Sequence, residues 1–265
     1  MSFENVECVK FKHNLLSEVI CQIRFPTILE IEKDVPSDFQ NLISEQFPNA
    51  NARLDMPESE GRFNISPLSL SSSFSGIQQP RKNYWFSSDD DNCNVNLTRN
   101  FLSFSTRNYD CWKDFCVTMN FVVDSFVKIY GRRTLTRIGL RYINAVSKSA
   151  LGLSENTLWS DLINIHLLGM MGDSKLSQNI KGMNSSMLLK CDNDISMQIQ
   201  TGIFVRMDNT SDEVFLIDND TFSTRKNTTD DVMSLLDSLH EEPRKFLHYA
   251  ITEKLRSIME PEVIC

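Results

Sequence analysis

The sequence predicts an α+β protein of two tandem units, at 1–131 and 132–265, each with the element order β-α-β-β-β-α. A strand pattern at 18–25, a short helix pattern at 38–43 and a long amphipathic helix at 112–130 recur about 119 residues later. A near-constant offset between elements of different type indicates two copies of one unit. We expect antiparallel sheet backed by long helices, as in helix-grip or TATA-binding-protein-like folds, packed as one compact body.

The first strand is predicted from strict alternation, since apolar Val19, Cys21, Ile23 and Phe25 occupy every second position. After Pro26 the chain is expected to end this strand or to continue it as an edge through residue 31. A helix is expected over 39–46, capped at residue 37 or 38 and closed before a proline at 48.

The rest of the first unit contains three clear strands and one helix. Residues 49–80 are rich in Asn and Ser and are expected to be loops around one strand near 63–65. Strands are predicted over 83–87, 94–97 and 101–106, and the acidic run 89–92 is expected to be a turn rather than a metal site. Apolar residues at three- and four-residue spacing predict a helix over 111–130, which ends at Gly131.

The second unit repeats this order. It begins with a strand from 135 to 144, followed by a helix over 154–165 and strands over 183–190, 195–205 and 213–217. The last helix is predicted over 230–259 and opens at the acidic residues 230–231. We expect Pro243 to kink or restart this helix, because proline lacks the donor N–H.

Composition limits the class of protein. The net charge of −8 argues against a surface that is a nucleic-acid footprint throughout. No signal-peptide pattern opens the chain, and no apolar run approaches the roughly 20 residues that span a bilayer. Seven cysteines without C-x-x-C pairs are expected to be reduced thiols. The sequence therefore predicts a cytoplasmic protein that does not insert into membranes.

The sequence carries no recognisable catalytic or metal-binding motif. The four histidines have no zinc-ligand spacing, and neither a G-x-S-x-G elbow nor a glycine-rich phosphate loop occurs. We therefore predict no catalytic residue, metal or cofactor, and favour a protein that is not an enzyme.

A cluster of basic residues is the strongest candidate for a binding surface. Residues 125–154 contain six Lys and Arg residues and no acid. Alternation places Arg137 and Arg141 on one side of their strand, and Gln22 and Arg24 occupy the matching side in the first unit. We predict a ligand- or partner-binding surface of Gln22, Arg24, Arg137, Arg141 and Asn144. The arginines either bind an anion, such as phosphate or carboxylate, or pair with some of the chain's 35 acids.

Three stretches resemble a known family: 16–26 (LSEVICQIRFP), 137–144 (RIGLRYIN) and 236–241 (LDSLHE). They are similar to the signature of a sporadically distributed prokaryotic family of similar length whose members have no assigned activity. The patchy distribution of such families implies cargo of mobile or defence islands. The resemblance supplies no catalytic residue and no ligand.

The leading functional expectation is a non-enzymatic binding or sensor protein, a recognition component of prokaryotic antiviral defence that acts through a protein partner. The alternative is a nucleotide- or nucleic-acid-binding protein, or a phosphoryl-transfer enzyme, that uses the cationic strand pair; the net charge disfavours it. A homo-oligomer is compatible with either reading.

Overall fold

The computed structural model describes residues 3, 6–7, 9–55, 81–173, 175–192, 194–205 and 213–263. The chain divides into two compact units: unit 1 comprises Met1–Ile20, Ile138–Arg225 and Val232–Cys265, and unit 2 comprises Cys21–Arg137 and Lys226–Asp231. Each unit contains antiparallel sheet and helices, so the α+β class is confirmed. The tandem duplication, its boundary at 131/132 and the likeness to helix-grip or TATA-binding-protein-like folds remain predictions.

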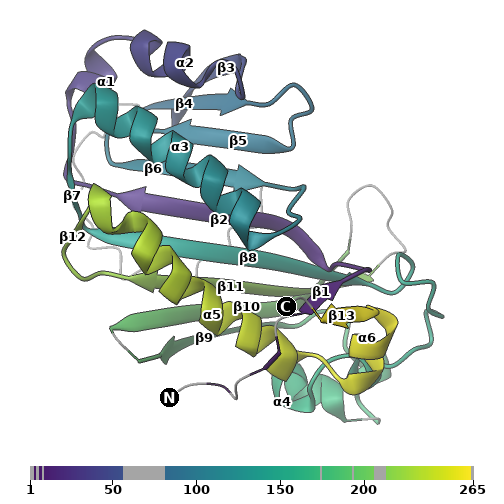
Figure 1. Cartoon of the computed structure of the whole chain (residues 1–265). Coiled ribbons are helices and arrows are strands. Elements are labelled where there is room, and N and C mark those ends of the chain that lie inside the picture. The colour runs from purple at the N-terminus through teal and green to yellow at the C-terminus, as the bar shows by residue number, and fades with distance from the viewer. Residues whose placement is uncertain are drawn as a thin grey trace, which may run out of the picture. The chain divides into compact units, whose positions relative to one another are not determined.

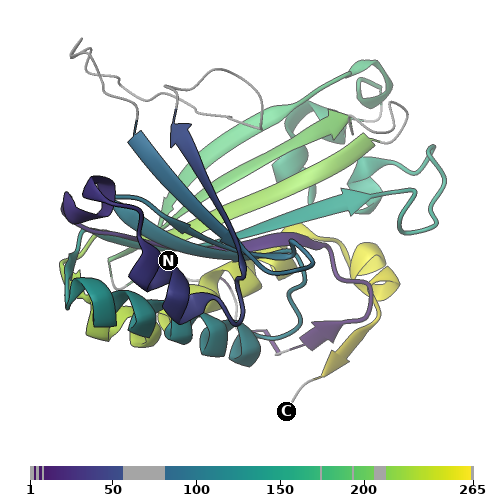
Figure 2. The same ribbon diagram turned by 90° about the horizontal axis from the view of Figure 1, so that it is seen from above.

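Unit 2 is an antiparallel sheet with helices on one face. Its strand order is β3-β4-β5-β6-β2, and α3 lies across these strands (Figures 1 and 2). Unit 2 also contains a short antiparallel pair of β7 (Thr134–Leu135) and β12 (Asn227–Thr228). The 3-10 turn η4 (Thr229–Asp231) follows β12. The other elements are β2 (Leu16–Arg24), α1 (Glu30–Lys33), α2 (Ser37–Ile43), β3 (Asn49–Asp55), β4 (Arg81–Ser87), β5 (Cys93–Leu97), β6 (Phe101–Thr106) and α3 (Trp112–Tyr130).

The core of unit 2 is an aromatic layer between sheet and helices. Phe25 packs on Phe126 of α3 with ring centroids 4.9 Å apart, and Phe104 packs on Phe115 at 5.1 Å. Phe39 of α2 meets the β4 ring of Phe86 at 5.6 Å. Because strand side chains alternate between faces, the residues between these anchors point to the helix-free face.

Unit 1 is a second helix-backed sheet. The strands β8, β11, β10 and β9 are neighbours in that order, and α5 crosses β11 and β10 (Figure 1). Its elements are β1 (Val9–Phe11), which pairs with β13 (Pro261–Val263), β8 (Arg137–Ser147), η1 (Trp159–Asp161), α4 (Ile165–Leu168), η2 (Gly169–Gly172), η3 (Ser177–Asn179), β9 (Asn184–Lys190), β10 (Ile195–Val205), β11 (Glu213–Ser223), α5 (Val232–Ala250) and α6 (Glu253–Ile258).

Most of the predicted elements are confirmed to within a few residues. These are the first strand, the three strands over 83–106, the helix over 111–130 and the strands over 183–205. The strand predicted at 213–217 continues to Ser223. The strand expected near 63–65 lies outside the described residues.

The helix predicted over 154–165 is wrong. This segment forms turns, the 3-10 turn η1 and the separate short helix α4, whose cap Asn164 accepts a hydrogen bond from the backbone N–H of His166. Its backbone is instead bonded to the segment where α5 ends and α6 begins: Asn164 N–H donates to Ala250 O at 2.8 Å, and Thr252 N–H donates to Leu162 O at 2.9 Å. These tertiary bonds replace the local helical ones.

Two smaller expectations have mixed outcomes. Of the two alternatives after Pro26, the structure matches the one in which the strand ends: β2 stops at Arg24, and residues 30–33 form the helix α1 instead of an edge strand. Helix α5 runs through Pro243 without restarting there, and this proline is buried. The single helix predicted over 230–259 is wrong in its second part, because α5 ends at Ala250 and a separate helix, α6, begins at Glu253 with Thr252 as its cap. Among the described residues, no helix combines the length and the apolar character needed to cross a bilayer.

Candidate functional site

Three of the predicted binding residues belong to unit 2. Gln22 and Arg24 lie opposite the fully buried Cys21 and Ile23, and Arg24 Nε donates to Gln22 Oε1 at 2.7 Å. Alternation therefore places Gln22 and Arg24 on the helix-free face of the unit 2 sheet. Arg137 is the residue after Thr136, whose backbone N–H donates to Arg24 O at 2.8 Å.

Arg141 belongs to unit 1 and forms a bidentate ion pair with Asp218 of β11. Its Nε lies 2.8 Å from Asp218 Oδ1 and its Nη2 lies 2.5 Å from Asp218 Oδ2. The hydrogen bond to Asp218 raises the pKa of Arg141, and the charges of Asp220 and Glu18 act in the same direction. For this arginine, the structure matches the alternative in which the basic residue pairs with the chain's own acids.

Asn144 lies on the opposite face of the unit 1 sheet from Arg141. It is 1% exposed, and its Nδ2 donates to Ile217 O at 3.4 Å. Alternation places it on the side of Tyr142, whose hydroxyl lies 2.7 Å from Nδ1 of His240 in α5. Asn144 thus faces the helix and not the side of the sheet that carries Arg141.

The helix-free face of unit 2 carries an extended set of polar side chains, which we call the polar face; four of them, Asn83, Asn96, Ser103 and Ser105, are buried. Arg53 lies over the ring of Trp85, with its Cζ 5.7 Å from the ring centroid. Asn96 Nδ2 donates to Tyr84 O at 2.9 Å and also contacts Asn83 Oδ1. No acid occurs among the described side chains of this face, which are Gln22, Arg24, Asn49, Asn51, Arg53, Asn83, Trp85, Ser87, Asn94, Asn96, Ser103 and Ser105.

Sequence reasoning missed most of the polar face. The signal was present as period-two polar patterns, N-x-N-x-R at 49–53, N-x-N at 94–96 and S-x-S at 103–105. The first of these fell in a stretch interpreted as loop, although it forms β3.

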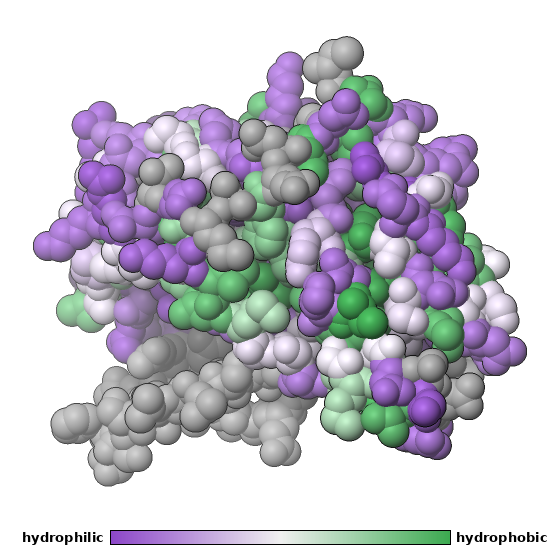
Figure 3. Space-filling view, turned by 90° about the horizontal axis from the view of Figure 1, so that it is seen from below, coloured by the Kyte–Doolittle hydropathy of each residue, from purple (hydrophilic) through white to green (hydrophobic). Residues whose placement is uncertain are grey.

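Unit 1 exposes several large apolar side chains from one short stretch, which we call the apolar segment: Leu158, Ile165, Met170 and Leu176. On the face of the molecule drawn in Figure 3, hydrophobic residues lie interspersed among hydrophilic ones. Within the same stretch, Trp159, Leu162 and Leu168 are buried. The segment is therefore anchored by its own core and still presents apolar side chains to solvent.

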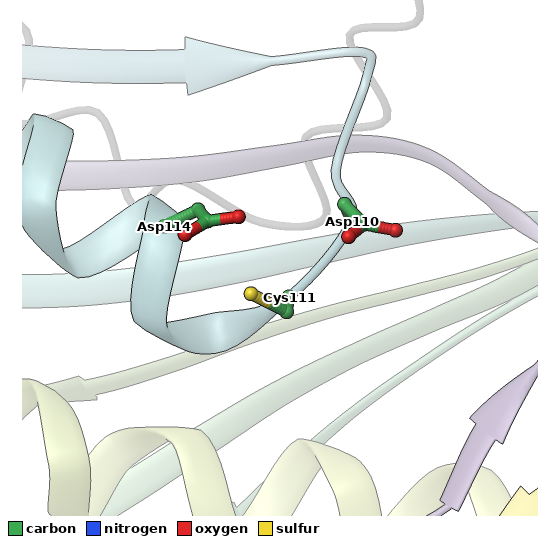
Figure 4. A group of neighbouring side chains, drawn as sticks. All are labelled: Asp110, Cys111 and Asp114. Carbon is green, nitrogen blue, oxygen red and sulfur yellow. The ribbon is translucent and has the colours of Figure 1, made fainter.

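A third group lies at the start of α3 in unit 2. Asp110, Cys111 and Asp114 place one ligand atom each within 4.8 Å of one another (Figure 4). Carboxylates and a thiolate are ligands that Zn²⁺ accepts. They also stand at a helix N-terminus, where the dipole stabilises negative charge without any metal. The D-C-x-x-D spacing is the sequence signal for this group, and nothing else in the described structure points to a cation there.

Comparison with known proteins adds little. No family model matches the chain, and no curated protein matches it. A solved structure described as "KH domains" aligns with 96% of this chain and 89% of that chain, at 9% identity and a TM-score of 0.27. A TM-score this low carries no argument about fold or function.

Proposed function

We propose that the protein is a non-enzymatic binding or sensor protein that acts by contact with a protein partner in the cytoplasm. The observation that carries this proposal is the apolar segment of unit 1. Protein interfaces depend on a few large side chains that become buried on binding, and clustered exposed apolar residues mark such surfaces.

The geometry of the apolar segment suits an interface. Met170 is 68% exposed and Ile165 is 55% exposed, within a stretch of short helical turns. Ile165 rests on Gly172, where an added Cβ would lie 2.6 Å from Ile165 Cγ1. Side chains held in place before binding lose less conformational freedom when a partner covers them.

The proposed biological setting rests on the family resemblance alone. The signatures at 16–26, 137–144 and 236–241 are similar to a family expected in mobile or defence islands. We therefore propose a recognition component of a prokaryotic antiviral defence system, with the partner encoded close by.

Co-purification from the native host tests the proposal. A tagged chain should retain its partner during phage challenge, whereas Met170→Asp should lose it, because a carboxylate cannot be buried unpaired at an interface. Val117→Asp is the matched control, since Val117 on α3 of unit 2 is 64% exposed. Retention by Met170→Asp, or a chain that never captures a protein, would contradict the proposal.

The polar face of unit 2 favours a second candidate, a nucleotide- or nucleic-acid-binding protein. Arg24 and Arg53 can contact phosphates, and Trp85 offers a ring on which a base can stack. No acid occurs among the described side chains of this face, so locally they favour an anion more than the net charge of the whole chain does.

A titration with a single-stranded oligonucleotide at two salt concentrations tests this second candidate. If the chain binds through phosphates, the logarithm of the binding constant should fall with the logarithm of the salt concentration, with a slope of roughly −0.7 per phosphate contact. At low salt, Arg53→Glu should bind the oligonucleotide more weakly than the unchanged chain does. Lys113→Glu, at an exposed lysine on α3, should have little effect. No binding at low salt would remove this candidate.

A further inference from the structure

We propose that unit 1 holds an uncharged hydrogen-bonding guest, water or a small neutral solute, between α5 and the strands β8, β11 and β10. Four polar side chains on the helix-facing side carry it: Asn144, Thr201, Asn219 and Thr221, exposed by 1%, 2%, 0% and 0%. Among the described residues, Asn144 Oδ1, Thr201 Oγ1, both amide atoms of Asn219 and Thr221 Oγ1 have no hydrogen-bond partner.

The strand register groups these side chains around Asn219. Tyr142 and Ile199 are its direct partners on the two neighbouring strands. Asn144 and Thr201 both pair with Ile217, two residues before Asn219, so each is a diagonal neighbour of Asn219. Diagonal neighbours lie roughly 7–8 Å apart, and Thr221 lies at a similar distance along the same strand. These separations are between backbone positions, and no direct hydrogen bond joins the polar atoms of these side chains, so a bridging molecule suits the site.

The helix does not supply the missing partners. Its buried residues over this sheet include Val232, Leu236, Leu239 and Phe246, all apolar. Buried polar atoms in native proteins almost always find a partner, and each exception calls for an explanation. A water with two to four polar neighbours is the commonest solution.

The chemistry of the four side chains defines the class of guest. Hydroxyl and amide groups donate and accept hydrogen bonds and carry no charge. His240, bonded to Tyr142, is neutral at pH 7, because burial lowers its pKa to about 4. A charged guest would find no counter-charge among the four polar side chains, so an uncharged guest with both donors and acceptors fits best.

An isosteric substitution tests the inference. Thr221→Val keeps the shape of the side chain and removes its hydroxyl, so loss of a hydrogen bond to a guest should lower Tm by about 2–4 °C. Thr136→Val, at an exposed threonine in unit 2, is the control and should leave Tm within about 1 °C. An unchanged or raised Tm for Thr221→Val would mean a dry site and would overturn the inference.

A crystal structure of the wild-type chain provides a second readout that does not depend on a variant. Density within hydrogen-bond distance of the Asn219 amide supports the inference, and its absence overturns it. Native mass spectrometry then separates the sources: an unchanged chain mass indicates water, and an added mass that is lost on denaturation indicates a solute.

Discussion

Arg141 is held in a bidentate ion pair with Asp218. Alternation along the strand correctly predicts that Arg141 points away from Leu140 and Tyr142, which are buried. Its partner lies 77 residues further along the chain, on a strand whose second half was not predicted. A single sequence does not reveal such a pairing, because register between strands depends on tertiary packing.

Removing the charge of Arg141 should destabilise unit 1. Asp218 is 4% exposed, so Arg141→Gln leaves a buried carboxylate without its cation. Because the guanidinium is partly exposed, we expect a loss of about 1–3 kcal/mol in the free energy of unfolding, measured by urea titration. Asp218→Asn in the same background should recover part of this loss. Additive effects of the two substitutions would contradict the pairing.

Stability should fall as the pH drops from 6.5 towards 4, partly through His240. Burial lowers the pKa of His240 to about 4 in the folded chain, so between these pH values the unfolded chain binds more protons than the folded chain does. We expect His240 to contribute up to about 3 kcal/mol to this loss. His240→Gln should show a shallower decline in urea unfolding at pH 6.5 and pH 4.5. An identical decline in both proteins would show that His240 is not buried as described.

At the scale of elements, sequence patterns correctly predicted the strands and the helix that bury one apolar face. Period-two alternation and the apolar helix stripe predicted β4, β5, β6 and α3, because each pattern reports which face is buried. The helix over 154–165 failed, since its backbone bonds to residues 250 and 252, far away in sequence. β3 was missed because its side chains are polar on the open face and carry little apolar signal.

The C-terminal end of α3 should require a glycine at position 131. Its φ is +74°, a conformation that side chains with a Cβ rarely adopt, and its N–H donates to Val127 O at 2.8 Å. Gly131→Ala should cost about 1 kcal/mol or more of unfolding free energy, from backbone strain alone, because an added Cβ meets nothing within 4 Å. Gly182→Ala, also in open space but without a positive φ, should cost much less. Equal effects in chemical denaturation would contradict this account.

At the scale of the whole molecule, the two units offer different surfaces. Unit 1 exposes the apolar segment, which suits a protein partner, and unit 2 carries the polar face, which suits phosphates and bases. The predicted arginine cluster is divided: Gln22 and Arg24 join the polar face, whereas Arg141 is paired with Asp218 and Asn144 is buried.

Amide hydrogen exchange, measured with and without the co-purified partner, tests the central claim most directly. If the apolar segment binds the partner, residues 158–176 should gain protection, because a covered backbone opens less often. Residues 49–53 and 94–105 of the polar face should exchange at the same rate in both samples. Protection confined to the polar face, or unchanged exchange over 158–176, would contradict the claim that the apolar segment is the recognition surface.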